Sequence, residues 1–364
     1  MNIALLPSTF TNQRAEATHI TLILMAKQLK KLGHKVYIIS DGRKDLPSKE
    51  VVEGINVYRG PALKPAILNK IISPIIKLKQ LKKKEIEFDV IHSFSAAKFI
   101  VVKAFIAKLL IGKVKVVHTL RSYSRSRIGN SFNWILNLAD YITVPTKIFA
   151  EKVGKKAKVI RSLIDLDKYK PKDKESSRKK LGIKDKFIIY YGGSRENKGI
   201  KILIDAFKIL NPVGIKLMII FREPVPKVYQ DYVSNKGIKN KCILIGKKLD
   251  NVQDYVMAAE IVVLPYINLI STEGNPSCII EAMASKTPVV TTNLPELKEI
   301  VIDGEDVIMA EPGSVNSLAK KIGLVLTDKN LQKKLVINGF KISKEFDAEK
   351  VVNQFLKLYS KKGL

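Results

Sequence analysis

Short apolar runs alternate along the chain with longer segments in which apolar residues recur at helical spacing. Residues 1–6, MNIALL, form the first run, residues 15–32 form an amphipathic segment that ends at Gly33, and residues 35–40, KVYIIS, form the next run. Short apolar runs are typical of buried parallel strands, and apolar residues at i, i+3 and i+4 are typical of helices. The opening therefore predicts strand, helix and strand, as in a doubly wound α/β domain that binds ligands at the carboxyl ends of its strands.

The same alternation continues to the end of the chain. Further apolar runs predict strands at 187–191 (FIIYY), 216–221 (KLMIIF), 241–246 (KCILIG) and 260–265 (EIVVLP), with helical patterns between them. The last three segments, 314–326, 330–344 and 348–358, read as helices. The lysine-rich stretch 168–180 is the best candidate for a linker between two such domains.

Length and composition agree with two globular domains. The chain has 364 residues, 46% of them hydrophobic, with a mean hydropathy of +0.02, which is enough for two cores. The first residues lack the pattern of a secretory signal, and no apolar run reaches membrane-spanning length. The two cysteines, Cys242 and Cys278, suggest neither a disulfide nor a metal framework. We therefore expect a protein of the reducing cytoplasm.

The net charge of +30, from 64 basic and 34 acidic residues, requires an explanation. About +20 of it precedes residue 176, and no acidic residue occurs from Val90 to Ala139. So basic a chain suggests nucleic acid, but it has no zinc-ligand spacing, aromatic RNA-binding run or glycine-rich basic tail. We expect an anionic membrane surface as the partner, and no nucleic acid.

Residues 61–84 carry seven lysines and no acidic residue. Their isoleucines and leucines recur at helical spacing, and Pro74 predicts a kink or break in the helix. One interpretation is a helix packed on the sheet with lysines toward solvent. The other is an interfacial helix whose apolar face enters the headgroup region. The lysines that would meet anionic lipid are Lys70, Lys77, Lys79, Lys82, Lys83 and Lys84.

The richest motif is STEGNPSCIIEAMASKTPVVTTNLPELKEI, from Ser271 to Ile300. Pro276 fits the first turn of a helix, since its missing N–H is not needed there, and an apolar helical face follows. The polar loop therefore ends at a helix N-terminus, whose unpaired N–H groups suit phosphate or sugar oxygens. Glu273 precedes this helix and Glu281 lies within it.

The two glutamates, the Gly-Asn-Pro-Ser loop and EAMASKTPVV closely resemble the nucleotide-sugar signature of family-4 retaining glycosyltransferases. The resemblance implies that Glu273 and the residues Gly274, Asn275, Pro276 and Ser277 hold the donor sugar. It also implies that Glu281 holds the ribose hydroxyls.

A second donor motif follows the strand FIIYY, in GGSRENKG. Gly192 and Gly193 permit a tight turn, and Lys198 begins a helix whose N-terminus favours an anion. Lys198 is thus the expected diphosphate ligand and an expected catalytic residue, with Gly193 and Ser194 beside it. Many relatives have arginine where Gly193 stands, so we expect Arg195, ahead of Arg222, to supply that charge.

The first half offers candidates for the acceptor side. His92 and His118 stand at strand ends, and His118 matches the family's histidine near the anomeric carbon of the donor. Arg121, Arg125 and Arg127 either meet a phosphate on the acceptor or form a solvated basic loop. The first loop lacks the paired glycines that many relatives carry there, so Arg14 is expected to contribute its side chain to the donor.

The resemblance implies the GT-B architecture, two Rossmann-like doubly wound parallel-sheet domains facing a central cleft. We expect an acceptor-side domain at 1–167, a nucleotide-sugar donor domain at 168–346, and a C-terminal helix at 347–364 that returns to the first domain. Asp165 and Asp167 lie at the domain junction, so we assign no metal, and we expect no cofactor.

The implied activity is transfer of a hexose-type sugar, with retention, from UDP- or GDP-sugar to an acceptor hydroxyl. We expect a lipid-linked, phospholipid or glycan acceptor at the cytoplasmic face of the cell membrane. Two alternatives stay open: a nucleotide-sugar 2-epimerase of the same fold, and a non-catalytic protein that binds nucleotide sugars.

Overall fold

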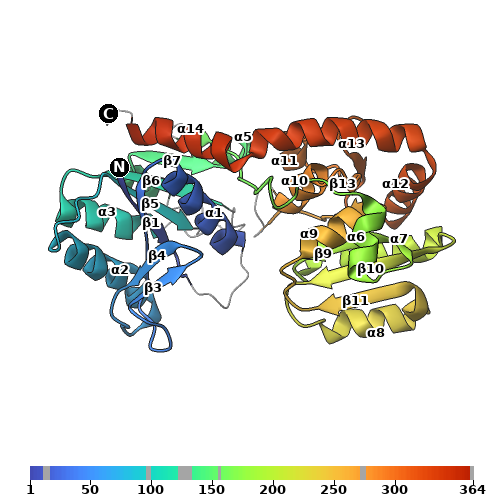
Figure 1. Ribbon diagram of the computed structural model, residues 1–364, viewed down its shortest axis with the longest axis horizontal. Coiled ribbons are helices and arrows are strands. Elements are labelled where there is room, and N and C mark those ends of the chain that lie inside the picture. Colours follow the sequence, from blue (N-terminus) through green and yellow to red (C-terminus); the bar gives the residue numbers. More distant parts are fainter. Residues whose placement is uncertain (11–16, 96–99, 122–132, 155–156, 271–275, 361–364) are drawn as a thin grey trace. The chain divides into compact units, whose positions relative to one another are not determined.

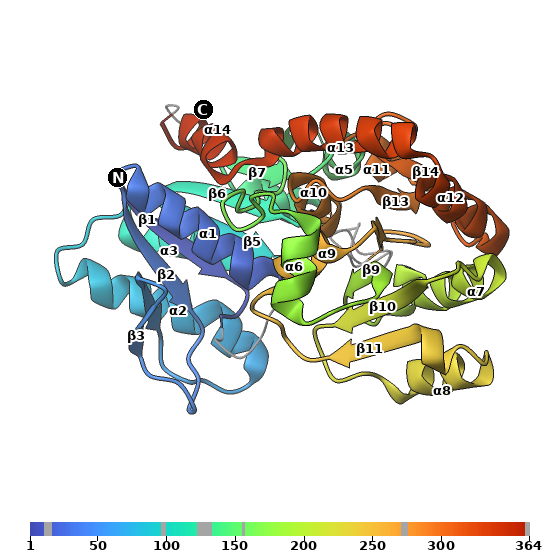
Figure 2. The ribbon, with the colours of Figure 1, turned by 45° about the vertical axis from the view of Figure 1, so that its right-hand side comes forward.

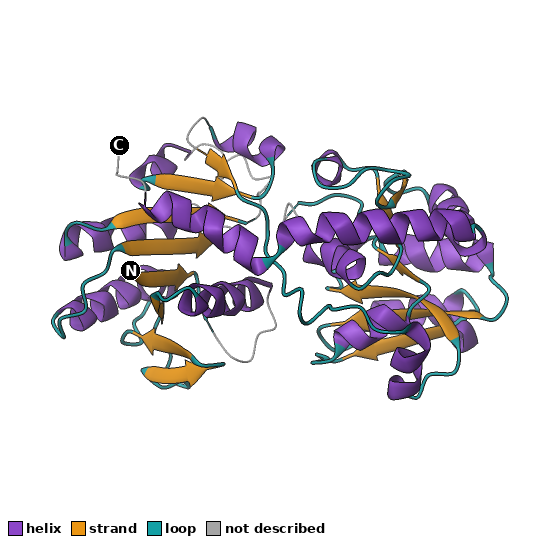
Figure 3. Cartoon of the chain, turned by 45° about the horizontal axis from the view of Figure 1, so that its top comes forward, coloured by secondary structure: helices purple, strands orange, loops and turns teal. Residues whose placement is uncertain are grey.

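The computed structural model describes residues 1–10, 17–95, 100–121, 133–154, 157–270 and 276–360. The chain divides into two compact units. The first comprises Met1–Leu163, Ile270–Gly274 and Ala348–Leu364, and the second comprises Ile164–Leu269 and Asn275–Asp347. Each unit has its own sheet with helices on both sides, as Figure 3 shows by colour.

The first unit contains an eight-stranded sheet (Figure 1). Its strands are β1 (Asn2–Pro7), β2 (Lys35–Ser40), β3 (Lys49–Val52), β4 (Ile55–Arg59), β5 (Val90–Ser95), β6 (Lys115–Leu120), β7 (Tyr141–Val144) and β8 (Ala157–Val159). They lie in the order β3-β4-β2-β1-β5-β6-β7-β8, and all described pairs are parallel except β3 with β4. The predicted strands at 1–6 and 35–40 are confirmed.

Helices cover both faces of this sheet because successive strand side chains point to opposite sides. Ile3 and Leu5 pack in the core under α1 and α14, whereas Ala4 and Leu6 pack in the core under α2 and α3. The helical segments of the unit are α1 (Ala17–Lys31), α2 (Ala66–Lys82), α3 (Ile100–Ile111), η1 (Asn133–Leu138), α5 (Lys147–Val153) and α14 (Ala348–Ser360).

The lysine-rich segment forms α2, and Pro74 does not break it. Pro74 is buried inside the continuous helix, together with Ile75, Leu78 and Leu81. This half of the helix packs on the domain core, as the first interpretation of the segment expected, and its apolar side chains are not available to a bilayer. Ile67 and Leu68, near the start of the helix, are exposed.

The second unit contains a six-stranded, all-parallel sheet. Its strands are β9 (Lys186–Gly192), β10 (Ile215–Phe221), β11 (Cys242–Gly246), β12 (Ile261–Val263), β13 (Val289–Thr292) and β14 (Ile308–Ala310). They lie in the order β11-β10-β9-β12-β13-β14, so β9 and β12 are neighbours near the centre. Both strands are buried along nearly their whole length, which explains their continuous apolar sequences.

Helices pack on both faces of this second sheet as well, and Figure 2 shows α8 beside the edge strand β11. The helical segments are α6 (Lys174–Leu181), η2 (Glu196–Lys198), α7 (Ile200–Leu210), α8 (Lys227–Asn235), η3 (Lys239–Lys241), α9 (Val252–Ala258), α10 (Ser277–Ala284), α11 (Pro295–Lys298), α12 (Val315–Thr327), α13 (Lys329–Ser343) and η4 (Lys344–Phe346). Among the residues that the structure describes, no helix is both long and apolar enough to cross a membrane.

A fully buried lysine lies between the first sheet and α3. Lys103 is 0% exposed, and its ammonium group donates a hydrogen bond to the carbonyl oxygen of Pro7 at the end of β1. Burial lowers the pKa of Lys103 to about 7; Asp41 acts to raise it and Lys70 to lower it further. The fold therefore buries a charge that titrates near neutral pH.

This burial predicts how stability depends on pH. Between pH 7 and about 10.5 the unfolded chain keeps the Lys103 proton that the folded chain has lost, so the free energy of unfolding rises with pH. One proton contributes at most about 1.4 kcal/mol per pH unit. Lys103→Met should remove this rise in urea unfolding between pH 7 and 9.5, whereas Lys113→Met, at an exposed position, should keep it. Equal slopes in both variants would contradict the assignment.

Candidate functional site

The turn after β9 is fixed by three side chains of the second unit. The Tyr190 hydroxyl donates to the Gly193 carbonyl at 2.6 Å, and the Tyr229 hydroxyl donates to the Ser194 carbonyl at 2.7 Å. The Ser194 N–H in turn donates to the Glu223 carboxylate at 2.8 Å. A Cβ added at Gly193 would have no described atom within 4 Å, so this side of the turn is open.

Lys198 and Gly199 join the β9 turn to the segment after β12. The Lys198 ammonium lies 4.7 Å from the centre of the Tyr266 ring. Gly199 has a φ of +71°, and a Cβ there would stand 1.9 Å from the Pro265 carbonyl oxygen. Only glycine allows the backbone at position 199 to come so close to the Pro265 carbonyl. This contact between the two segments holds Lys198, the preceding residue, over the Tyr266 ring.

The signature helix α10 begins one residue later than the sequence indicated. Pro276 is its N-cap residue rather than its first-turn residue, and Ser277 is the first helical position. The apolar face is buried as expected, with Ile279 and Ile280 completely enclosed. The helix therefore starts at the end of the loop that the motif predicted.

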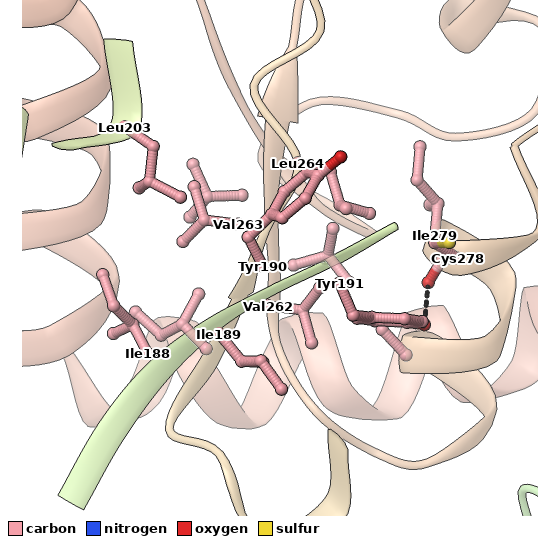
Figure 4. Packing of buried hydrophobic residues seen from close by; sticks show 14 of the residues in the cluster. Ile188, Ile189, Tyr190, Tyr191, Leu203, Val262, Val263, Leu264, Cys278 and Ile279 are labelled. Carbon is pink, nitrogen blue, oxygen red and sulfur yellow. Dashed lines mark hydrogen bonds between the residues drawn. The ribbon is translucent and has the colours of Figure 1, made fainter. Parts of the chain in front are cut away.

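Two tyrosines hold Glu281 on this helix. The Tyr191 hydroxyl lies 2.8 Å from the Cys278 carbonyl oxygen, the contact dashed in Figure 4, and 3.2 Å from the Glu281 carboxylate. Burial and then the charge of Glu281 raise the pKa of both Tyr191 and Tyr169, and each hydroxyl hydrogen-bonds that carboxylate. Both phenols stay protonated, so both can orient Glu281.

The two arginines considered for the turn lie in different environments. Arg195 is exposed and precedes η2 as its N-cap residue. Arg222 is partly buried and follows β10, where its backbone N–H donates to the Gly192 carbonyl at 3.2 Å. The structure thus gives Arg222, the second choice from the sequence, the more enclosed position.

His118 of the first unit is fully buried on β6. Its Nδ1 lies 2.7 Å from the Ser93 hydroxyl, while its Nε2 has no hydrogen-bond partner among the described residues. Burial lowers the pKa of His118 to about 3, and the charge of Lys103 acts in the same direction. The imidazole is therefore neutral at physiological pH.

His92 of β5 lies inside the core of the first unit. Its Nδ1 lies 2.5 Å from the Tyr359 hydroxyl on α14, and its Nε2 lies 2.6 Å from the Thr119 hydroxyl. The ring is 0% exposed and stacks on Phe94. With both nitrogens bonded inside the core, His92 fastens α14 to the sheet. Its contact with an acceptor stays a prediction.

Arg121 lies at the end of β6 and is only 9% exposed. It lines a pocket within the first unit together with Arg161, which the sequence analysis did not single out. The other lining residues are Thr21, Phe94, Thr119, Leu120, Pro145, Ile160, Ser162, Leu163 and Phe355. Arg121 and Arg161 are the basic residues that line this pocket, and most of its lining is apolar.

Six of the predicted site residues lie outside the described residues. They are Arg14, Arg125, Arg127, Glu273, Gly274 and Asn275.

Asp165 has a structural contact of its own, because its carboxylate accepts the Lys168 N–H at 3.0 Å. Within the described ranges no cluster of three or more His, Cys, Asp or Glu side chains could hold a metal ion.

Sequence reasoning missed the tyrosines Tyr169, Tyr191 and Tyr266, as well as Lys103. The tyrosines come together only through strand pairing and long connections, so no spacing reveals them. Lys103 carried a signal, since it is a lysine on the buried stripe of the otherwise apolar segment IVVKAFIA.

Two family models match the chain. The model described as Glycosyltransferase Family 4 matches residues 19–168, and that described as Glycosyl transferases group 1 matches residues 173–342. Among curated proteins, N-acetyl-alpha-D-glucosaminyl L-malate synthase of Bacillus anthracis is 24% identical over 361 residues, covering 92% of this chain and 91% of that protein. An uncharacterized glycosyltransferase of Methanocaldococcus jannaschii is 31% identical over 173 residues, covering 48% and 47%.

Solved structures share the fold over nearly the whole chain. Sucrose-phosphate synthase from Thermosynechococcus elongatus has a TM-score of 0.81 at 19% identity, covering 98% of each chain. HepE from Anabaena, solved in complex with UDP-glucose, has a TM-score of 0.77 at 19% identity, covering 99% of each chain.

The contrast between two glycines of the β9 turn gives a test of the site geometry. Gly199→Ala should lower the free energy of unfolding by about 2 kcal/mol or more, because its Cβ meets the Pro265 carbonyl and its φ is positive. Gly193→Ala should change it by no more than about 0.5 kcal/mol, because the added Cβ enters open space. Urea unfolding measures both, and equal effects would show that the Gly199 approach is misplaced.

Proposed function

Because the chain belongs to the family-4, group 1 glycosyltransferases, and its two parallel-sheet α/β units have the GT-B fold, we propose that it moves a hexose from UDP- or GDP-sugar to an acceptor hydroxyl with retention. One observation carries the proposal. The β9 turn, Tyr266 and the start of α10 bring Lys198, Ser277 and Glu281 to the carboxyl ends of neighbouring strands, where this class of sheet binds nucleotides.

In the second unit, the donor would bind through its diphosphate, sugar and ribose. Lys198 meets the diphosphate, and the open side of the turn at Gly193 and Ser194 lets phosphate oxygens approach the backbone. Glu281, whose carboxylate is hydrogen-bonded by two tyrosines, accepts hydrogen bonds from the ribose hydroxyls. By the family resemblance, Glu273 and the Gly274 to Ser277 segment bind the sugar. The first loop departs from the family in lacking paired glycines, and the Arg14 side chain would contribute to donor binding in their place.

In the reaction, the bond between the anomeric carbon and the diphosphate oxygen breaks, and the acceptor oxygen forms a bond to the same face of that carbon. The acceptor proton passes to the departing phosphate oxygen, so nucleoside diphosphate leaves. Lys198 stabilises the charge that develops on this oxygen. A neutral His118 does not repel the positive charge that develops on the sugar, which suits its buried, uncharged state.

In the first unit, the acceptor would carry a phosphate or a similar anion. The pocket that contains Arg121 and Arg161 supports this, because guanidinium groups match such anions in bidentate geometry. Arg125 and Arg127 are expected to add to the same positive potential.

A lipid-linked or phospholipid acceptor at the cytoplasmic face of the membrane fits the charge of the first half. Lys79, Lys82, Lys83 and Lys84 are exposed at the end of α2, with Lys70 and Lys77 partly exposed on the same helix. The anchor would be mainly electrostatic, because much of the apolar face of α2 is buried in the unit, with Ile67 and Leu68 as its exposed apolar contacts.

The donor assignment predicts a loss of transfer in two variants. Lys198→Ala and Glu281→Gln should each reduce transfer from labelled nucleotide sugar to a membrane extract about a hundredfold, since each removes a contact worth about 3 kcal/mol. Lys208→Ala, at an exposed position of α7, is the control. We also expect EDTA to leave the rate unchanged. Release of free epimer, or binding without transfer, would contradict the proposal.

Membrane attachment predicts a salt-dependent association with anionic vesicles. Replacing Lys70, Lys77, Lys79, Lys82, Lys83 and Lys84 by glutamine should abolish sedimentation with phosphatidylserine vesicles at low salt, since each engaged lysine contributes about 1 kcal/mol. Nucleotide binding should stay unchanged.

The matched control for this variant replaces six exposed lysines of the second unit by glutamine. They are Lys208, Lys239, Lys241, Lys320, Lys333 and Lys341. Both variants lose the same net charge, so equal loss of sedimentation in the two would reject α2 as the anchor.

A further inference from the structure

The β9 turn carries glycine at position 193, where the family resemblance leads one to expect arginine. A diphosphate bears more negative charge than Lys198 alone can neutralise, so another cation is needed near the turn if the proposed donor binds there. Arg195 is the obvious neighbour in the sequence. It is exposed, however, and precedes η2, so its guanidinium would have to be drawn out of solvent.

Arg222 reaches the same turn from the next strand. Phe221, the last residue of β10, pairs with Gly192 in the sheet, and the Arg222 N–H donates to the Gly192 carbonyl at 3.2 Å. The backbone of Arg222 is therefore hydrogen-bonded to the residue just before Gly193. This places an arginine beside the turn although it is far from it in the sequence.

The charge of Arg222 acts on several tyrosines around the turn. Burial raises the pKa of Tyr169, Tyr190 and Tyr266, and the positive charge of Arg222 opposes that rise on all three. These tyrosines come from the start of the second unit, from β9 and from the segment after β12. The partly buried Arg222 therefore lies within electrostatic range of all three, in agreement with its backbone position beside Gly192.

Lys198 contacts one of these tyrosines directly. Its ammonium lies 4.7 Å from the centre of the Tyr266 ring, and Tyr266 is also within electrostatic range of Arg222. One buried tyrosine is therefore close to a cation that follows β9 and within range of a cation that follows β10. Tyr190 connects this group to the turn. Its hydroxyl donates a hydrogen bond to the Gly193 carbonyl, and the charge of Arg222 acts to lower its pKa.

We propose that Arg222 is the second diphosphate-binding cation of this chain and, with Lys198, takes over the role that an arginine at position 193 has in relatives. The inference rests on the proposed donor site. It makes the site a pair of converging cations, one after β9 and one after β10. The open space at Gly193 is then the volume that phosphate oxygens occupy.

The test compares affinities for UDP and UMP, and for GDP and GMP, by calorimetry on the full chain. The ratio of diphosphate to monophosphate affinity measures how much the second phosphate group contributes to binding. The fraction of protein that is active cancels in this ratio. Arg222→Gln should lower that ratio at least tenfold with little change in monophosphate affinity, and Arg222→Lys should lower it less. Lys227→Gln, at an exposed position on α8, is the control and should match the wild type.

A restored arginine supplies the reverse experiment. Because position 193 has room for a side chain, Gly193→Arg in the Arg222→Gln background should recover most of the lost ratio. An unchanged ratio in Arg222→Gln, or the loss found in Arg195→Gln instead, would overturn the inference while leaving the donor site in place. A wild-type protein that binds neither diphosphate would overturn the donor site itself.

Discussion

The close approach of Gly199 to the Pro265 carbonyl is the constraint on which the second unit's site depends. It exists because β9 and β12 are adjacent parallel strands whose following segments must pass each other without an intervening side chain. Once the backbones meet there, Lys198 stands over Tyr266, and Tyr190 and Tyr191 project from β9 to the turn and to α10. The Tyr190 and Tyr191 hydroxyls then donate to the backbone carbonyls of Gly193 and Cys278, and fixed backbone positions of this kind are the condition for preorganised charge stabilisation.

The interior of the first unit contains buried basic groups, and burial disfavours their charged, protonated forms. Lys103 and His118 are both fully buried, burial lowers the pKa of each, and the charge of Lys103 lowers the pKa of His118 further. His92, by contrast, has both nitrogens satisfied and ties α14 to the strands. The difference matters because a buried donor or acceptor without a partner costs free energy, whereas one with partners specifies the packing. His118, whose Nε2 has no described partner, is therefore the better candidate for a ligand contact.

The strands and helices could be predicted because their periodicity is a local property, and so could the start of α10 and the turn before Lys198. Contacts that depend on strand order could not. The pattern around His92 identifies a strand end but does not reveal that Tyr359, 267 residues away, will take its Nδ1. Pro74 illustrates the limit of a local rule, which predicted a kink or a break: the helix does not break, and Ile75 and Leu78 are buried beside the proline. Glu281 was found from its motif, but the tyrosines that hold it were not.

The comparison of Gly193 with Arg222 shows why a site should be compared with its relatives by charge in space as well as by sequence position. A parallel sheet places the residues after neighbouring strands at one edge, so a cation can be supplied from either strand with little change in where its charge lies. A comparison by sequence position alone would indicate that Gly193 has lost a phosphate-binding cation. In the folded chain, the hydrogen bond from Arg222 to Gly192 sets the two positions side by side, which is the reason for proposing that Arg222 supplies the charge for the diphosphate.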